Sequence, residues 1–535
     1  MTHFNTTGGD ALVAALRAHG THTLFGLPGI QLDGLFNALH DTPDLRVINA
    51  RHEQGVAYMA LGYALANQAP GLFAVVPGPG LLNAGAALST AYALHAPVLA
   101  LVGQLDTAGI GRGFGALHEL PDQSGLLRGL TRWAGLATSA ADIPALVARA
   151  YAQLGAGLGP AGLELPRDML LGPAELAPAF AYTLPPLPPD PQAIHQAAAL
   201  LAGAQAPLIL VGGGAARAGH ALRALSRRLQ APVASHLTGR GILDSADPYA
   251  IGRTEAVALW PEADVILAIG TRLRSPRQTW KLRPGQRVIR IDIDPAQFTR
   301  GTPPDIAILA DARLATEALL AQLGAGMRPM REESLRRLKA TTEAAYERDL
   351  APQMAWLRAL RGALPEQSVV VADYTQLGYM AAACLPVAHP NRVISPGYQG
   401  TLGFAFPTAL GAKVARPDWP VVSLSGDGGF LFAATELATA AQHGIATVAV
   451  VFNDGAYGNV RRMQVQQYGN RVIASDLRNP DFLALAASFG VAAQRAETPD
   501  SFATTLRHAI DSGTPTLIEV PMPVLPDPWH LLEPE

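Results

Sequence analysis

Short apolar runs alternate with longer segments of mixed polarity along the whole chain. The runs have the length of β-strands, and the segments between them have the length and patterning of helices. This alternation is typical of parallel sheets covered by helices, so we predict an α/β protein built from doubly wound parallel sheets. The strand-like runs are THTLFGL, LRVINA, GLFAVV, PVLALVG, APLILVG, DVILAIG, RVIRIDI, SVVVAD, PVVSLS, TVAVVF and PTLIEV.

Two changes in composition divide these runs into three groups. Residues 172–190 are rich in proline, as in an extended linker, and residues 326–360 are charged and patterned as helix. A chain of 535 residues is also longer than one hydrophobic core can organise. We therefore predict three α/β domains of comparable size, at residues 1–171, 191–325 and 361–535.

Composition and charge exclude several classes of function. The net charge of −3 gives no general attraction for nucleic acid or anionic membranes. The N-terminus predicts an amphipathic helix and not a signal peptide, and no apolar run is long enough to span a membrane. Cys384 is the only cysteine, so no intrachain disulfide can form and the cytoplasm is the expected compartment. A hydrophobic content of 49% with only 16% charged residues fits a chain that buries surface against copies of itself.

The most informative stretch is residues 426–458. One apolar run ends there in Gly-Asp-Gly-Gly, a helix-like segment follows, and a second apolar run ends in Asn-Asp. Two parallel strands joined by a crossover helix would place Asp427 and Asp454 at the same edge of a sheet. Carboxylates suit a hard divalent cation, and Gly428 and Gly429 let backbone N–H groups approach an anion. The stretch predicts a site for Mg²⁺ and a diphosphate, although a lone acidic, Gly-rich loop is usually only a loop.

A second group of candidate residues lies in the first domain. Glu53 follows an apolar strand and enters a helix, where an acid often does no more than complement the helix dipole. The next strand ends in a Gly/Pro turn at residues 77–80 that leads to Asn83. Such strand-end loops are where α/β sheets bind ligands. A carboxyl group held among apolar residues there keeps its proton firmly, as an acid–base group must.

Several separate motifs together resemble one known family. The chain is similar over essentially all 535 residues to the thiamine-diphosphate enzymes of the acetolactate synthase, benzoylformate decarboxylase and pyruvate oxidase superfamily, most of all to acetolactate synthase large subunits. The resemblance implies a pyrimidine-binding, a central and a diphosphate-binding domain, in that order. The motifs that carry it are FGLPG (25–29), RHEQGVAYMALGYA (51–64), GPGLLNA (78–84), GTLGFAFPTALGA (400–412), GDGGF (426–430) and NDGAYG (453–458).

The resemblance implies where thiamine diphosphate and Mg²⁺ bind. Asp427, Asp454 and the backbone oxygen of Ala456 match the family's metal ligands, although most relatives have Asn in place of Asp454. Leu402 matches the bulky residue beneath the cofactor, with an ordinary core leucine as the alternative, and the carbonyl of Gly400 would accept a hydrogen bond from the cofactor's amino group. The remaining implied cofactor contacts are Gly29, Pro79, Asn83, Thr375, Gln376, Gly428, Gly429 and Tyr457.

The resemblance also implies roles in the reaction. Glu53 matches the acid that hydrogen-bonds the pyrimidine ring and activates the cofactor. His118 stands where acetolactate synthases have an active-site glutamine, and it is either a proton shuttle or a polar loop residue. The expected substrate pocket contains Ile30, Gln31, His118, Asn459, Val460 and Met463. In this family two subunits share each active site, so a homodimer or homotetramer is expected.

The implied reaction is decarboxylation of a 2-oxo acid with carboligation to an acceptor. A simple 2-oxo acid decarboxylase, a flavin-dependent oxidase and a catalytically silent homologue that keeps the cofactor site are the alternatives. FAD is disfavoured because residues 270–280 depart from the acetolactate synthase pattern, although residues 211–221 and 291–295 look like nucleotide-binding segments. Arg272, Arg274 and Arg277 would serve an acidic group or form a solvated basic loop.

Overall fold

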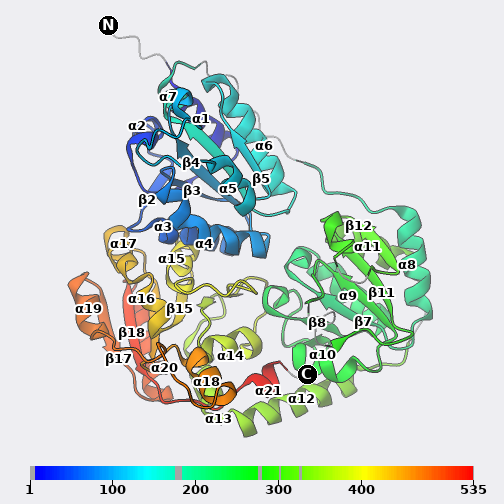
Figure 1. The fold of residues 1–535 in the computed structure, drawn as a ribbon. Helices are drawn as coiled ribbons and strands as arrows, with labels where there is room; N and C mark the ends of the chain where they lie inside the picture. Colours follow the sequence, from blue (N-terminus) through cyan, green and yellow to red (C-terminus); the bar gives the residue numbers. More distant parts are fainter. Residues whose placement is uncertain (1–5, 175–183, 275–279, 301–302, 325–327, 534–535) are drawn as a thin grey trace. The chain divides into compact units, whose positions relative to one another are not determined.

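The structure is a computed structural model that describes the chain except for residues 1–5, 175–183, 275–279, 301–302, 325–327 and 534–535. Its residues form two compact units (Figure 1). The first unit contains residues 1–184, 365–375 and 396–521. The second contains residues 185–364, 376–395 and 522–535.

The first sheet, in the first unit, has six parallel strands in the order β2-β1-β3-β4-β6-β5. They are β1 (Thr23–Gly26), β2 (Arg46–Asn49), β3 (Gly71–Val75), β4 (Val98–Gln104), β5 (Trp133–Leu136) and β6 (Ala161–Pro166). The sheet's helices are α1 (Gly8–Ala18), α2 (Asp33–His40), α3 (Glu53–Asn67), α4 (Pro79–Leu94), α5 (Gln123–Leu130), α6 (Ile143–Gly155) and α7 (Arg167–Leu171). A core of leucine, isoleucine, valine and alanine side chains from α1, α2, α6 and the strands fills one face of this sheet.

Another six-stranded sheet has the order β14-β13-β15-β16-β18-β17, and its registered pairs are parallel. Its strands are β13 (Val369–Ala372), β14 (Val393–Ile394), β15 (Val421–Gly426), β16 (Val448–Asn453), β17 (Ala492–Arg495) and β18 (Thr516–Pro521). The helices near it in sequence are α14 (Gln376–Cys384), α15 (Ala405–Ala415), α16 (Asp427–Leu431), α17 (Leu437–His443), α18 (Gly458–Gln467), α19 (Phe482–Ser488), α20 (Pro499–Asp511) and α21 (Trp529–Leu532).

Within the first unit, α3 and α15 pack against each other between these two sheets (Figure 1). Both helices are apolar on nearly every side and almost wholly buried, as expected for helices with no face in water. Their backbones touch at two glycines. A Cβ on Gly62 would lie 1.9 Å from the carbonyl oxygen of Thr408, and one on Gly411 would lie 1.8 Å from the carbonyl oxygen of Met59. Only glycine therefore allows this closeness.

The second unit is built on a six-stranded parallel sheet with the order β12-β11-β10-β7-β8-β9. Its strands are β7 (Leu208–Val211), β8 (Val233–Ser235), β9 (Ala250–Ile251), β10 (Val265–Ile269), β11 (Arg287–Asp292) and β12 (Ile306–Leu309). Its helices include α8 (Pro191–Gly203), α9 (Gly219–Leu229), α10 (Arg253–Leu259), α11 (Ala312–Gln322), α12 (Glu332–Asp349) and α13 (Ala351–Ala363).

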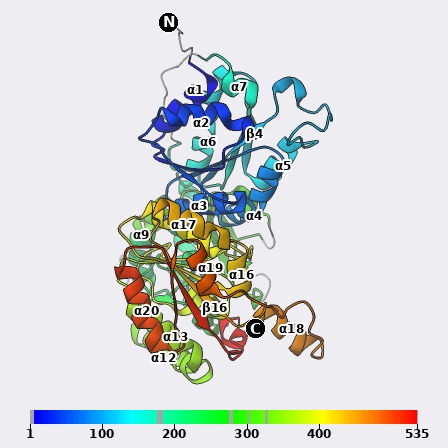
Figure 2. The ribbon, with the colours of Figure 1, turned by 90° about the vertical axis from the view of Figure 1, so that its left-hand side faces the viewer.

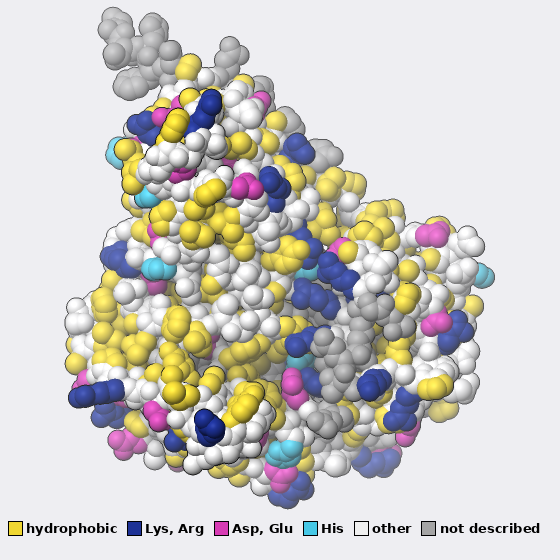
Figure 3. Space-filling view, in the orientation of Figure 1, with side chains coloured by type: hydrophobic (Ala, Val, Ile, Leu, Met, Phe, Trp, Pro, Cys, Tyr) yellow, Lys and Arg dark blue, Asp and Glu magenta, His cyan; other side chains and the backbone are white. Residues whose placement is uncertain are grey.

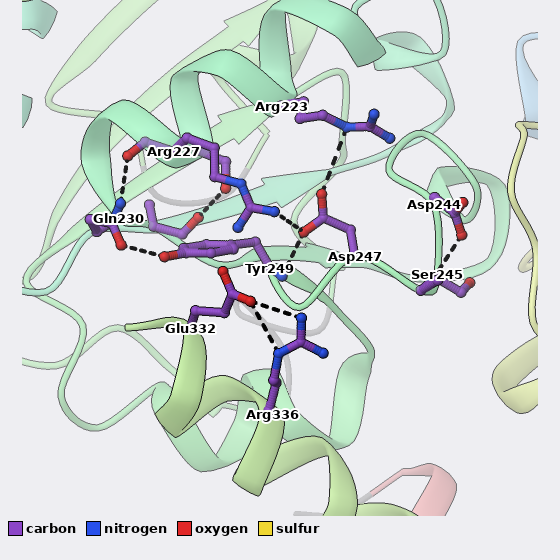
Figure 4. Close-up of polar contacts among 12 residues, drawn as sticks. Arg223, Arg227, Gln230, Asp244, Ser245, Asp247, Tyr249, Glu332 and Arg336 are labelled. Carbon is purple, nitrogen blue, oxygen red and sulfur yellow. Dashed lines mark hydrogen bonds and ion pairs between the residues drawn. The ribbon is translucent and has the colours of Figure 1, made fainter. Parts of the chain in front are cut away.

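A polar cluster around Asp247 joins α9, α12 and the loop before β9 in the second unit (Figure 4). The buried Asp247 carboxylate accepts hydrogen bonds from Arg227 at 2.9 Å and from the backbone N–H of Tyr249 at 2.9 Å. The Arg227 guanidinium also stacks on the Tyr249 ring, with its carbon 4.1 Å from the ring centroid. Lys339 of α12 donates to the carbonyl oxygens of Ser245 and Asp247. The Asp247 carboxylate and the Lys339 ammonium group are thus both satisfied within the unit, which indicates a structural role.

The predicted fold class is confirmed, but the apolar runs did not reveal every strand. Each of the eleven runs contains a strand, and the described residues form seven further strands that the runs did not reveal: β5, β6, β8, β9, β12, β14 and β17. Several of these are short, and β17 lies at a sheet edge with mostly exposed side chains. Such strands carry little apolar signal because few of their side chains enter the core.

In the part of the chain that the structure describes, no helix is both long and apolar enough to cross a membrane.

Candidate active site

Asp427 and Asp454 lie at the same edge of one sheet, as the sequence predicts. Asp427 follows β15 and begins α16, Asp454 follows β16, and the two strands pair in parallel with Gly426 opposite Phe452. Burial and the negative charge of Asp427 raise the pKa of Asp454 to about 6. A carboxylate whose ionisation is opposed by a neighbouring carboxylate in this way is stabilised by a shared cation.

The atoms around this pair fit a hard metal ion. Asn479 donates from Nδ2 to Asp427 Oδ2 at 2.5 Å and to Asn453 Oδ1 at 2.9 Å, which orients the Asp427 carboxylate. The described residues contain no cluster of three or more His, Cys, Asp or Glu side chains that could hold a metal. Two carboxylates with the carbonyl of Ala456 form a different set, of oxygen donors only, which is what Mg²⁺ prefers.

The Gly-Gly pair after Asp427 lies close to other predicted cofactor contacts. A Cβ on Gly428 would lie 2.5 Å from the ring of Tyr457, so the ring covers this glycine. A Cβ on Gly429 would lie 3.9 Å from Leu402, and one on Gly426 would lie 3.6 Å from Thr375. A further predicted contact, Gln376, is the first residue of α14 in the second unit.

The loop before α15 holds Leu402 between two glycines in left-handed conformations. Gly400 has φ of 65° and Gly403 has φ of 76°, values that favour glycine. The Leu402 side chain is 38% exposed, so it is not an ordinary core leucine. The carbonyl oxygen of Leu402 accepts a hydrogen bond from Gln54 Nε2 at 3.3 Å, which places this loop beside the start of α3.

Glu53 is the first residue of α3, and its carboxylate is held by a neighbouring helix. Asn83 of α4 donates from Nδ2 to Glu53 Oε2 at 3.0 Å. Pro79 begins α4 after Gly78, whose φ of 59° turns the chain into the helix. The side chain of His52 caps α3 by accepting from the backbone N–H of Gln54 at 3.1 Å. The structure therefore brings both predicted strand-end loops together.

The predicted pocket residues come from three segments of the first unit. Ile30 is exposed, whereas Gln31 is buried and bonded to the His118 segment. Gly29 lies against the β3 end, where its Cβ would be 2.3 Å from Val76. Asn459, Val460 and Met463 lie on α18, which stands out on the same side of the unit as the segment after β4 (Figure 2).

Comparison with known proteins agrees with this geometry. Residues 6–126 match the N-terminal TPP binding domain of thiamine pyrophosphate enzymes, residues 194–319 match their central domain, and residues 373–520 match their C-terminal TPP binding domain. The chain is 35% identical over 530 residues to the "Probable 2-ketoarginine decarboxylase AruI" of Pseudomonas aeruginosa, covering 96% of this chain and 94% of that protein. The chain belongs to the thiamine pyrophosphate enzymes.

Two further relatives carry the name of acetolactate synthase. The "Acetolactate synthase isozyme 2 large subunit" of Escherichia coli is 32% identical over 545 residues, which is 98% of this chain and 97% of that protein. The "Probable acetolactate synthase large subunit" of Methanocaldococcus jannaschii is 34% identical over 546 residues, or 96% and 91% of the two chains. This enzyme is thus of the acetolactate synthase and decarboxylase type.

Two residues that support the site of this thiamine pyrophosphate enzyme were missed in the sequence. The buried Glu436 carboxylate accepts hydrogen bonds from the backbone N–H groups of Arg51 and His52 at 3.1–3.2 Å, directly before Glu53. Asp373 follows β13, and burial raises its pKa to about 7, which favours its protonated form. Glu436 had a readable signal, because it is the only charged residue between Asp427 and His443.

The segments that look like nucleotide-binding turns have a packing explanation. A Cβ on Gly212 would lie 2.4 Å from the carbonyl oxygen of Gly270, and Gly214 is similarly close to Gly270. The Gly-Gly-Gly turn therefore lets two loops of the second unit approach each other.

Arg277 lies outside the described residues. The matches to TPP binding domains support thiamine diphosphate and give no support for FAD.

Proposed function

We propose that this protein decarboxylates a 2-oxo acid with thiamine diphosphate and Mg²⁺ and transfers the remaining group to a carbonyl acceptor. The main observation behind the proposal is that Asp427 and Asp454 lie together at the carboxyl ends of two neighbouring parallel strands. The hydrogen-bonded pair Glu53 and Asn83 at the edge of another sheet supports it. The similarity to proteins named acetolactate synthase supports the transfer step.

The geometry above supports a set of residues that would hold the cofactor. Asp427, Asp454 and the Ala456 carbonyl would bind Mg²⁺, and the metal would neutralise the carboxylate pair. Gly428 and Gly429 would receive the diphosphate, with Thr375 nearby. The partly protonated Asp373 would limit the negative charge in this region, since its pKa is raised to about 7.

Glu53 would control a proton at the other end of the cofactor. When bound, thiamine diphosphate supplies a nucleophilic carbon that adds to the substrate carbonyl and then accepts the electron pair left by CO₂. Glu53 would hold the pyrimidine ring nitrogen by a hydrogen bond, and Asn83 would keep the carboxyl group pointed at it. His118 would take and return a proton on the substrate side.

The predicted pocket residues carry no negative charge of their own. Ile30, Gln31, His118, Asn459, Val460 and Met463 include no carboxylate that could pair with a cationic side chain. The nearby Glu119 carboxylate already accepts the N–H groups of Gly113 and Ala116 at 2.8 and 2.9 Å. The polar Asn459 suggests an additional polar group on the substrate or acceptor.

A simple decarboxylase is the second candidate. Its support is the 35% identity to a protein named a 2-ketoarginine decarboxylase. The two candidates differ in the fate of the group that remains after CO₂ leaves, because a simple decarboxylase releases it as an aldehyde.

We also propose a homodimer, or a pair of such dimers, as the working assembly. Ile30, Leu82, Leu117, Val460 and Met463 all belong to segments of the predicted site, and each is at least 43% exposed. Yellow, apolar side chains are visible over α18 in the space-filling view (Figure 3). Exposed apolar side chains mark interaction surfaces where they form a patch, and the symmetric partner for a homo-oligomer is a second copy.

One experiment tests the proposed function. The purified protein is given thiamine diphosphate and Mg²⁺ with a panel of 2-oxo acids, and CO₂ release is measured with and without aldehyde or ketone acceptors. The proposal expects CO₂ together with a ligated product. CO₂ with aldehyde alone would identify the simple decarboxylase, and no CO₂ from any acid would favour a catalytically silent homologue.

A further inference from the structure

His118 has a backbone conformation that residues other than glycine rarely adopt. Its φ is 69°, in the left-handed region, which costs roughly 1–2 kcal/mol for a residue with a Cβ. The surroundings hold it there: a Cβ on Gly78 would lie 2.4 Å from the His118 carbonyl oxygen, so the two backbones are in direct contact. The adjacent Glu119 fixes the preceding turn through its hydrogen bonds to Gly113 and Ala116. Strain of this kind, maintained by several neighbours, is typical of functional positions.

The buried side chain of Gln31 forms two hydrogen bonds to this segment. Gln31 is 5% exposed and lies in a short 3₁₀ helix, Ile30–Leu32. Its Nε2 lies 3.1 Å from the carbonyl oxygen of Leu117, and its Oε1 lies 3.1 Å from His118 Nδ1. Gly103 of β4 packs close to this side chain, since a Cβ on Gly103 would lie 3.2 Å from the Gln31 Cβ, and so restricts it further.

These two contacts determine which ring nitrogen of His118 carries the proton. A backbone carbonyl can only accept, so the Gln31 amide nitrogen must face Leu117 and its oxygen must face the ring. The amide oxygen has no hydrogen, so Nδ1 must donate. In a neutral imidazole the other nitrogen, Nε2, is then without a proton. We propose that Gln31 is a positioning residue that holds His118 as the Nδ1-protonated tautomer and leaves Nε2 as the atom that accepts the substrate-side proton.

The arrangement suits a residue that takes and returns a proton. When Nε2 accepts a proton the ring becomes an imidazolium with N–H groups at both nitrogens, and Nδ1 still donates to the same Gln31 oxygen. The Gln31 amide therefore fits both charge states without turning over. The inference rests on the function proposed above, in which His118 faces the substrate, and it adds the identity of the reactive atom and of the residue that fixes it.

A spectroscopic experiment tests the tautomer without substrate or cofactor. The full chain is labelled with ¹⁵N-histidine, and the His118 signals are identified by their absence in the His118→Asn variant. The expected spectrum at a pH where the ring is neutral shows a protonated Nδ1 and an unprotonated Nε2. In Gln31→Met, which has no amide oxygen to accept from the ring, the proton should move substantially to Nε2. A wild-type ring protonated at Nε2 would overturn the inference.

A double-mutant cycle tests whether Gln31 acts through His118. We expect Gln31→Met to lower kcat/KM roughly 10–100-fold, the loss that is typical when the partner of a metal-bound histidine is removed. In the His118→Asn background the same substitution should change kcat/KM less than about 2-fold, because interacting residues are not additive. An undiminished loss in that background would show that Gln31 acts independently, which would refute the proposal.

Two further variants guard against a purely structural effect. Gln31→Glu keeps an oxygen facing Nδ1, so it should keep the tautomer and more activity than Gln31→Met. Gln353→Met removes another buried glutamine, whose Nε2 donates to the Pro526 carbonyl at 2.8 Å, and should leave kcat/KM and the His118 spectrum unchanged.

If no 2-oxo acid releases CO₂, the proposed function fails while the spectra still decide the tautomer. If CO₂ is released and His118→Asn is fully active, the role of His118 fails.

Discussion

The contact between α3 and α15 gives the sharpest prediction about stability. Gly62→Ala would place a carbon 1.9 Å from the Thr408 carbonyl oxygen, whereas real contacts of this kind are at least 3.0 Å, so the helices must move apart by about 1 Å. Overpacking costs typically about 1–3 kcal/mol, and a clash with backbone cannot be relieved by a rotamer change. The better helix propensity of alanine returns up to about 1 kcal/mol. We therefore expect a net loss of about 2 kcal/mol in the free energy of unfolding.

The measurement is the midpoint of thermal unfolding, together with activity. A loss of about 2 kcal/mol corresponds to a fall of roughly 4–8 °C for a large domain. Activity should fall too, because α3 begins with Glu53 and α15 follows the Leu402 loop. Gly129→Ala on α5 is the matched control in the same unit: its Cβ would have nothing within 4 Å, so it should be neutral or slightly stabilising. A Gly62→Ala protein that melts at or above the wild-type temperature would refute the packing argument.

The contacts of the site give three other predictions. Glu53→Gln should lower CO₂ release by about 10²–10⁴-fold or more while thiamine diphosphate still binds, and near-normal turnover would exclude Glu53 from proton transfer. Asp427→Ala should abolish Mg²⁺-dependent binding of thiamine diphosphate in calorimetry, and EDTA should do the same to the wild type; tight binding without metal would contradict the assigned ligands. Because burial raises the pKa of Asp373 from 3.8 to about 7, the folded protein retains a proton that the unfolded chain loses. Stability of the cofactor-free protein should therefore fall as pH rises from about 4 to 7, by up to about 4 kcal/mol, and Asp373→Asn should flatten this dependence in urea unfolding.

Much of the site was readable because its residues follow apolar strands. Asp427 and Glu53 begin the helices that follow strands and Asn83 lies near the start of α4, so the direction of each strand determines the edge at which they lie. Glycines that allow close approach, such as Gly400 and Gly428, could be read from the motifs as well. The domain boundaries and the ligand roles of these residues stay predictions.

The supporting contacts could not be read, because they join residues that no periodicity connects. Glu436 bonds the backbone of Arg51, hundreds of residues earlier, and backbone N–H groups leave no trace in the sequence. Gln31 was placed in the pocket, but its buried position and its bond to His118 depend on how the loop after β4 folds back. The left-handed conformation of His118 has no sequence signal either, since the surrounding loop imposes it and the residue type does not.

Glu436 makes the two ends of the proposed site mechanically dependent on each other. Glu436 lies in the short segment that follows the Gly-Asp-Gly-Gly loop. Its carboxylate accepts hydrogen bonds from the backbone N–H groups of Arg51 and His52, directly before Glu53. A displacement of the loop at Asp427 would therefore be transmitted to Glu53 through the hydrogen bonds of Glu436. Substitutions in this stretch should therefore alter proton chemistry at Glu53.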